Sequence, residues 1–214
     1  MSLAEIGPGR DCPLCPRLVA FRTLWRGREP AWHNAPVDSF GNRDARLLIV
    51  GLAPGLRGAN RTGRPFTGDF AGDLLYSTLT TFGFARGLFD ARPDDGLELV
   101  DAAIVNAVRC VPPENKPTTD EIRTCRPFLR DTIDAMPKLE AIVALGKIAH
   151  DTVLVALGRR MAAHRFAHGA IHEIGGLAVF DSYHCSRYNT NTGRLTTEMF
   201  HQVFDGVRKA LDAA

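Results

Sequence analysis

Residues 46–52 read RLLIVGL, an apolar run of strand length that leads into the glycine-rich segment GLAPGLRGANRTGRPFTGD at residues 51–69. Three further apolar runs follow along the chain, and segments of helical character separate them. These runs are residues 101–108 (DAAIVNAV), 141–145 (AIVAL) and 177–183 (LAVFDSY). Short apolar strands separated by helices are typical of a parallel sheet that is covered on both faces. We therefore expect an α/β fold.

The segments between the strands carry helix and turn signals. Thr118 and Glu121 have the spacing of a capping box, which favours a helix that starts there. The Gly175-Gly176 turn predicts a hairpin between residues 170–174 and 177–183. The expected helices lie near residues 16–25, 69–81, 118–135, 147–157 and 192–211.

The composition is that of an ordinary folded chain. Its 214 residues include 26 Lys and Arg against 24 Asp and Glu, and 45% are hydrophobic, which excludes disordered and collagen-like chains. No run approaches the ~20 apolar residues of a membrane-spanning helix, and the N-terminus lacks the features of a signal peptide. We expect a single domain over residues 1–214, in the cytoplasm, with no membrane partner.

Four of the five cysteines suggest a metal centre. Cys12 and Cys15 form a CxxC pair, and Cys110 and Cys125 flank a loop of fourteen residues. Four thiolates suit either tetrahedral zinc or a [4Fe–4S] cluster. Zinc sites are typically built from two tight pairs, so the wide second spacing favours iron–sulfur. Four unrelated buried thiols are the remaining alternative.

Polar residues follow the predicted strands at their carboxyl ends, where open parallel sheets bind ligands. Residues 51–69 carry glycines whose free amides can form an anion or carbonyl site, without the spacing of a Walker or dinucleotide motif. Within this segment, Phe66 could equally be a core residue and Asp69 a helix N-cap. Asn106 could read the hydrogen-bonding edge of a ligand or cap a turn.

A histidine follows the last strand, in the segment YHCSRYNTNTGR at residues 183–194. His184 is a candidate acid or electrostatic catalyst, with a surface histidine as the alternative. Cys185 is adjacent, but neighbouring side chains in an extended segment point in opposite directions. We therefore expect no Cys–His dyad.

Considered together, these motifs identify a family. The blocks GLAP (51–54), NRTGR (60–64) and FTGD (66–69) are followed by His184, Ser186 and NTNTGRL (189–195). This combination resembles the uracil-DNA glycosylase superfamily, specifically its type-5 iron–sulfur branch. The cysteines that match the cluster ligands of the family, in order, are Cys12, Cys15, Cys110 and Cys125.

The resemblance implies a fold and an activity. The fold is a three-layer α/β/α sandwich with a central four-stranded parallel sheet and an N-terminal segment that binds a [4Fe–4S] cluster. The activity is hydrolysis of the N-glycosidic bond of uracil, and of other deaminated bases such as hypoxanthine, in double-stranded or single-stranded DNA. The resulting abasic site initiates base excision repair. A monomer associated with the nucleoid is expected.

The resemblance also assigns roles to individual residues. Phe66 would stack on the flipped base, and Asn106 would pair with its edge. His184 would donate a hydrogen bond to the base oxygen on which charge develops, assisted by backbone amides near Gly51. A polar residue positions water in other branches where this chain has Leu52, so we expect Asp69 to orient the water.

Basic residues in the same loops would contact DNA. The second motif of the family has prolines where this chain has Cys185 and Arg187, so Arg187 or Tyr188 would fill the space left in the base stack. Two other classes remain open: a non-catalytic iron–sulfur protein that binds nucleic acid, and a zinc-bearing nucleotide-processing enzyme. The arginines expected to hold phosphates are Arg57, Arg61, Arg64 and Arg194.

Overall fold

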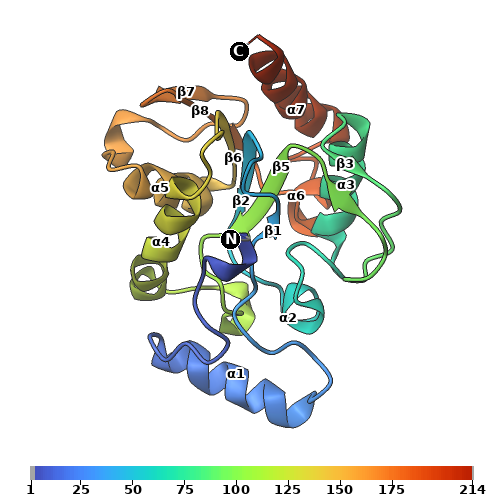
Figure 1. The fold of residues 1–214 in the computed structure, drawn as a ribbon, viewed down its shortest axis with the longest axis vertical. Coiled ribbons are helices and arrows are strands. Elements are labelled where there is room, and N and C mark those ends of the chain that lie inside the picture. The colour runs from blue at the N-terminus through green and yellow to red at the C-terminus, as the bar shows by residue number, and fades with distance from the viewer. Residues whose placement is uncertain (1–2, 214) are drawn as a thin grey trace.

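The computed structural model describes residues 3–213, and a six-stranded sheet in the order β1-β5-β2-β6-β8-β7 forms its centre (Figure 1). The four inner strands are parallel to one another. Every residue of β2, β5 and β6 is buried, because helices cover both faces of the sheet, and this explains the continuous apolar runs. The parallel strands are β2 (Leu47–Gly51), β5 (Ala102–Asn106), β6 (Ala141–Leu145) and β8 (Leu177–Ser182).

An antiparallel strand lies at each edge of this parallel core. β7 (Ile171–Ile174) pairs with β8 through the predicted glycine turn, in which Gly175 and Gly176 both have positive φ. β1 (Phe40–Gly41) pairs with β5. The predicted α/β fold with four parallel strands is confirmed. β1 was not predicted, because two residues are too few to produce a pattern.

Helices form the outer layers. α3 (Phe70–Thr81) and α7 (Thr197–Asp212) pack on one face of the sheet, and α4 (Thr119–Asp134) and α5 (Lys147–Ala156) pack on the other (Figure 1). Alternate residues of β2 serve the two cores: Leu47 and Ile49 face α3 and α7, whereas Leu48 and Val50 face α4 and α5.

The predicted capping box is present at the start of α4. The Glu121 backbone N–H donates to Thr118 Oγ1 (3.2 Å), and the Thr118 N–H donates to Glu121 Oε2 (2.8 Å). The prediction of one helix over residues 192–211 is wrong at its start. Gly193 has a φ of 70°, which breaks a helix, and α7 begins only after its N-cap Thr196. The short α6 (Arg187–Asn191) precedes this break.

The N-terminal segment contains α1 (Pro16–Arg28), which lies apart from the sheet at the bottom of Figure 1. Arg17 joins it to α4 through a bidentate contact with Glu121, with Nη2 2.6 Å from Oε2. Among the described residues, no helix has the length and apolar content needed to cross a membrane. The remaining short elements are η1 (Leu3–Glu5), α2 (Ala59–Thr62), β3 (Ala85–Arg86), β4 (Glu98–Leu99), η2 (Pro113–Asn115) and η3 (Met161–Ala163).

Candidate active site

A cavity of about 500 Å³ lies beyond the carboxyl ends of β2, β5 and β8. It brings together four of the residues singled out in the sequence: Phe66, Asp69, Asn106 and His184. The segments that carry them are far apart in the chain and meet because parallel strands end at the same edge of the sheet. The other lining residues are Leu52, Ala53, Pro54, Gly55, Ala59, Gly68, Phe70, Ala71, Asn115, Ser186 and Arg187.

Gly51 does not itself line this cavity, but its lack of a side chain leaves room for two residues that do. It pairs in register with Asn106 across β2 and β5, so the ends of these strands lie side by side. A Cβ at Gly51 would lie 2.5 Å from Asn106 Oδ1 and 2.7 Å from Phe66 Cζ. Phe66 itself has a φ of 55°, and its carbonyl oxygen occupies the place of a Cβ on Gly72. Two glycines therefore permit the position of the Phe66 ring.

Asn106 is 3% exposed, and its side-chain amide has no hydrogen-bond partner among the described residues. Because Asn106 lines the cavity, its amide can serve a ligand or an ordered water there. One amide offers both a donor and an acceptor, which is the pattern needed to read the edge of a pyrimidine.

The His184 imidazole lies against Phe66, with ring centroids 5.9 Å apart and planes 27° apart. Burial lowers the pKa of His184 to about 4, so the ring is neutral at pH 7 and has one N–H to donate. The backbone carbonyl of His184 accepts a 2.8 Å hydrogen bond from the Asn189 side chain, which fixes the loop. The side chain itself has no hydrogen bond within the described part of the chain.

The two carboxylate oxygens of Asp69 have different surroundings. One carboxylate oxygen accepts a 3.3 Å hydrogen bond from the Gly72 N–H and caps α3, as the sequence allowed. The other oxygen, Oδ2, lies so close to two loop glycines that a Cβ on Gly55 or Gly58 would be 3.0 or 2.8 Å away. Burial of the carboxylate by surrounding protein atoms raises the pKa of Asp69. Hydrogen bonds from backbone N–H groups of α3 oppose this shift but do not cancel it.

The prediction that Arg64 holds a phosphate is wrong, because its guanidinium has a partner inside the protein. Its side chain is 5% exposed and forms a bidentate pair with Asp95, at 2.7 and 2.8 Å. This pair holds the pKa of Asp95 well below its usual range. The other predicted DNA contacts are exposed: Arg57, Arg61, Arg187, Tyr188 and Arg194.

Two of these exposed arginines lie on aromatic rings. The Arg187 guanidinium is 5.5 Å from the centre of the Phe70 ring, at the rim of the cavity. The Arg194 guanidinium is 4.6 Å from the centre of the Tyr183 ring. Both contacts leave the charged groups at the surface, since a guanidinium that stacks on a ring keeps its N–H groups free.

The four predicted cluster cysteines line one hollow between α1, α4 and the segment after β5. Backbone N–H of Arg109 donates to Cys125 Sγ (3.3 Å), and Arg22 Nη1 donates to Cys110 Sγ (3.7 Å). Burial raises the pKa of Cys15 to about 11 and of Cys110 to about 12. Such sites suit thiolates only when a metal centre supplies positive charge. The four thiol side chains of this hollow offer the donor set of a tetrahedral zinc site or of a multi-iron cluster.

A sequence model described as "Uracil DNA glycosylase superfamily" matches residues 39–208, most of the chain. The chain belongs to the uracil-DNA glycosylase superfamily. The type-5 uracil-DNA glycosylase of Thermus thermophilus is 47% identical over 199 residues, which cover 90% of each chain. That of Pyrobaculum aerophilum is 41% identical over 207 residues, 95% of this chain and 89% of the relative. A type-4 uracil-DNA glycosylase of Pyrobaculum aerophilum is 36% identical over 152 residues, 71% of this chain and 63% of the relative.

Cys185 stands at one of the two positions where the second motif of the uracil-DNA glycosylase superfamily has proline. The Cys185 side chain is buried in the core beside α3, and its thiol lies 3.4 Å from the Ala71 carbonyl oxygen, to which it donates. It does not line the cavity that contains His184. The expectation that these two neighbours form no dyad agrees with this placement.

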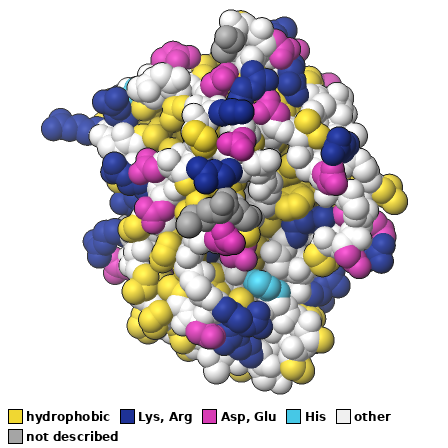
Figure 2. All heavy atoms as spheres, in the orientation of Figure 1, with side chains coloured by type: hydrophobic (Ala, Val, Ile, Leu, Met, Phe, Trp, Pro, Cys, Tyr) yellow, Lys and Arg dark blue, Asp and Glu magenta, His cyan; other side chains and the backbone are white. Residues whose placement is uncertain are grey.

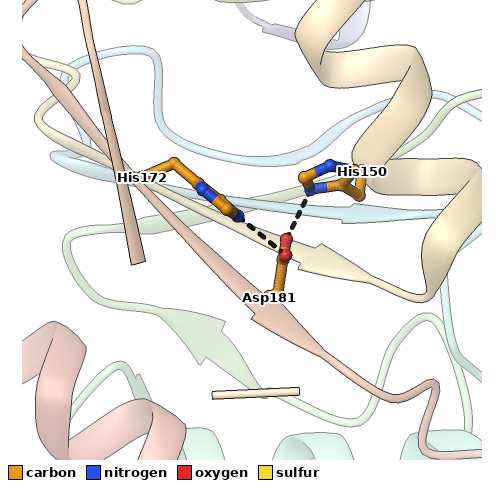
Figure 3. Close-up of side chains that lie close together, drawn as sticks. All are labelled: His150, His172 and Asp181. Atoms are coloured by element: carbon orange, nitrogen blue, oxygen red, sulfur yellow. Dashed lines mark hydrogen bonds and ion pairs between the residues drawn. The ribbon is translucent and has the colours of Figure 1, made fainter. Parts of the chain in front are cut away.

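The sequence reasoning missed a buried network behind His184. His150 Nδ1 lies 2.6 Å from Asp181 Oδ1, and His172 Nε2 lies 2.9 Å from Asp181 Oδ2 (Figure 3). His150 Nε2 also lies 2.9 Å from the His164 carbonyl oxygen. Both nitrogens of His150 thus face acceptors, so both carry protons and the ring is an imidazolium. Burial opposes this charge, but the two hydrogen bonds outweigh it and raise the pKa of His150.

This network supports the strand that leads to the cavity. Asp181 lies on β8, three residues before His184, and the Tyr183 N–H donates to His168 Nδ1 (3.1 Å) in the same neighbouring segment. The 2.6 Å contact between His150 and Asp181 is a hydrogen bond, because two ligands of one zinc ion would be about 3.4 Å apart. A pair of histidines near a buried aspartate was the available sequence signal, but their spacing of 22 and 9 residues matches no motif.

Asn115 lines the cavity, and the sequence reasoning did not single it out. It ends η2 in the left-handed conformation, with a φ of 56°, and this brings it to the rim of the cavity. Asparagine tolerates this conformation better than most residues, so its place in the loop sequence PPEN was a usable turn signal.

Proposed function

We propose that the protein removes uracil from DNA by hydrolysing its N-glycosidic bond and so leaves an abasic site. The single observation that carries this proposal is the cavity shared by Phe66, Asp69, Asn106 and His184. It combines an aromatic face, an unpartnered amide, a neutral donor and a carboxylate. The names of the type-5 relatives, which cover most of this chain, support the same activity.

Substrate binding requires that the nucleotide leave the base stack, at a cost of a few kcal/mol. The Phe66 ring offers a stacking surface that returns about 1–3 kcal/mol. The Asn106 amide offers an acceptor and a donor to the edge of uracil. Cytosine presents the opposite pattern at that edge, so the orientation of the amide that pairs with uracil does not pair with cytosine.

Bond cleavage places negative charge on the departing base and positive charge on the sugar. His184, neutral at pH 7, donates its N–H to the base oxygen, and a donor aimed at developing charge contributes about 3–4 kcal/mol. Asp69 orients the attacking water with the oxygen that α3 does not use, and its negative charge stabilises the sugar cation. The cap on α3 holds this carboxylate in place.

We also propose that Cys12, Cys15, Cys110 and Cys125 hold a [4Fe–4S] cluster. Its support is the shared hollow and the N–H groups directed at two of the sulfurs. When bound, the cluster supplies a covalent cross-link between the N-terminal segment and α4. The residues of this chain supply all steps of base removal.

The wider proposal concerns substrates and setting. We include other deaminated bases such as hypoxanthine as substrates, in single-stranded or double-stranded DNA. Arg57, Arg61, Arg187, Tyr188 and Arg194 provide the contacts to DNA. We place the single domain of residues 1–214 in base excision repair, as a cytoplasmic, nucleoid-associated monomer.

Excision from a panel of labelled oligonucleotides tests this function. Each contains one uracil, hypoxanthine or normal base, in single-stranded or duplex form, and alkali reveals abasic sites. We expect strand cleavage at uracil, and none at cytosine or thymine. Binding of uracil-containing DNA without any cleavage would instead support the non-catalytic alternative, in which Leu52 marks a lost water-positioning residue. A colourless protein that contains zinc would overturn the cluster assignment.

A further inference from the structure

Beside the cavity lies a surface hollow of about 360 Å³ that no step of base removal uses. Trp25, Glu29, Trp32, Arg57 and Arg61 line it, so residues from the end of α1 meet residues from the loop before α3. We call this surface, together with its extension described next, the tryptophan trough. Figure 2 shows one group of Lys and Arg side chains on the lower part of this face, with others spread over the rest of it.

The trough continues into a second, shallower hollow of about 560 Å³. Trp32 and Arg61 border both hollows, and Arg10 and Arg92 lie around the second one. The trough is therefore an extended surface with Trp32 at its centre. An extended basic surface with a central aromatic ring suits a strand of nucleic acid better than a compact ligand.

The aromatic side chains of the trough are arranged for stacking. The Trp25 and Trp32 rings are parallel, with planes 2° apart and centroids 5.5 Å apart. Trp25 is also packed against Phe21 and Arg28. Trp32 is half-buried and lines both hollows, so part of its ring is accessible to another planar group. Unpaired bases stack on such faces regardless of their sequence.

The charge of the trough is complementary to DNA. Arg10, Arg57 and Arg61 have no ion pair with any described residue, whereas nine of the other 19 arginines do. Arg92 is paired with Asp90 (3.0 Å), and Glu29 is the one acidic residue among those that line the trough. Three unpaired guanidinium groups around an indole are suited to the phosphates on either side of a stacked base.

The trough is continuous with the cavity. Ala59 of α2 lines the cavity, and Arg61, two residues later, lines the trough. The Arg61 guanidinium packs on Gly68, a lining residue of the cavity, so closely that a Cβ there would lie 3.0 Å from Nη2. A DNA strand whose uracil occupies the cavity therefore has a direct path across Arg61 to Trp32.

We propose that the tryptophan trough binds the single-stranded DNA flank of the uracil, with an unpaired base stacked on Trp32 and phosphates held by Arg57 and Arg61. This inference rests on the proposed function, because it extends the same substrate. It predicts that an unpaired flank on one side of the uracil raises affinity, whereas the same flank paired with a complementary strand does not. Only an unpaired base has a free face to stack.

Intrinsic fluorescence tests this directly, because the chain has two tryptophans and both lie in the trough. The probes are oligonucleotides with one 2′-fluoro-2′-deoxyuridine, which resists hydrolysis, and a flank of about 10 nucleotides on the 5′ side, on the 3′ side or on neither. The holoprotein is titrated with each probe, single-stranded or with its flank paired. We expect tryptophan quenching and tighter binding with an unpaired flank on one side only.

Variants locate the effect. Trp32→Leu should remove the affinity gain of the unpaired flank, which we expect to be about 5- to 150-fold. Arg130→Gln, an exposed arginine of α4 that is ion-paired with Asp134, is the matched control and should retain it. The wild-type fluorescence needs no variant, so the test stands even where Trp32→Leu fails to fold.

Equal binding of flanked and unflanked probes, without quenching, overturns the trough. So does quenching that requires a paired flank, or an affinity gain that persists in a folded Trp32→Leu protein. Excision of ordinary deoxyuridine by the same preparation separates the two proposals. Excision without a flank effect removes the trough alone, whereas quenching by flanked probes without excision supports the trough and removes the glycosylase activity.

Discussion

The Phe66 ring lies where a side chain on Gly51 would have to be: a Cβ at Gly51 would come within 2.7 Å of Phe66 Cζ. The same Cβ would lie 2.5 Å from Asn106 Oδ1. The base-stacking surface and the base-reading amide therefore both depend on one glycine at the end of β2.

Gly51→Ala is expected to displace both side chains. Overpacking of this kind costs about 1–3 kcal/mol of folding free energy. A displacement of about 1 Å near the reacting atoms lowers a rate about 100-fold. We expect a loss of this order in single-turnover excision of uracil, with DNA binding less affected. Gly27→Ala is the control, since nothing lies within 4 Å of a Cβ there; equal rates in the two variants would contradict this role of Gly51.

His184→Ala is expected to lower single-turnover excision by about 10²–10³-fold, the usual loss for one donor at a developing negative charge. Because burial lowers the pKa of His184 to about 4, the ring stays neutral between pH 5 and 8. The ratio of wild-type to variant rates should therefore be constant across that range. A step in this ratio near pH 6.5 would show that the histidine titrates normally and would refute the neutral donor.

Asp69 is expected to show different effects in its two variants. Asn is a good N-cap, so Asp69→Asn should keep the stability of α3 yet lose excision, because the negative charge is gone. Asp69→Ala should lose excision and also about 1 kcal/mol of stability. Thermal melts and single-turnover rates measure the two effects. Full excision by Asp69→Asn would exclude the carboxylate from water activation.

The cysteine variants are expected to fall into two groups. Cys110→Ser removes a ligand from the shared hollow, so it should lose the visible absorbance of the cluster, together with its iron content, and melt at a lower temperature. Cys185→Ala, at a buried cysteine outside that hollow, should keep the absorbance and serves as the control. A coloured, iron-replete Cys110→Ser protein would contradict the cluster assignment.

The imidazolium of His150 predicts a pH dependence of stability. Its pKa is raised in the folded protein, so its contribution is complete below the unfolded value of about 6.5 and is lost as the pH rises through the folded value. Each unit of difference contributes about 1.4 kcal/mol. Denaturant melts from pH 6 to 9 should therefore show a decline in wild type that is smaller in His150→Gln. Parallel curves for both proteins would mean that His150 is not charged.

The parallel strands could be predicted because each is a short apolar run between helical segments, and β6 was predicted at its observed bounds. The meeting of four cavity side chains also followed from the sequence, since Asn106 and His184 stand at strand ends, and Phe66 and Asp69 belong to the glycine-rich segment that follows β2. The start of α7 could not be predicted so well, because Gly193 interrupts a segment that is otherwise helical in character. The catalytic and binding roles of Phe66, Asp69, Asn106 and His184 remain predictions.

The burial of Arg64 could not be predicted from the motif to which it belongs. It belongs to the same block as Arg61, but its partner Asp95 is 31 residues away, and nothing in the local sequence indicates the pair. Trp25 and Trp32 are similar, because their relation to Arg61 arises only when α1 is placed beside α2. The network of His150, His172 and Asp181 likewise joins two strands and a helix.

The sequence by itself determined the α/β class, the family and the segments that carry the chemistry, because these depend on local periodicity and on residues close together in the chain. The tertiary structure alone decided which polar side chains face the cavity and which are satisfied internally. Arg61 and Arg64 are both arginines of one loop, yet one is exposed beside the cavity and the other is buried against Asp95. Burial and pairing depend on partners distant in sequence, and only the folded chain brings them together.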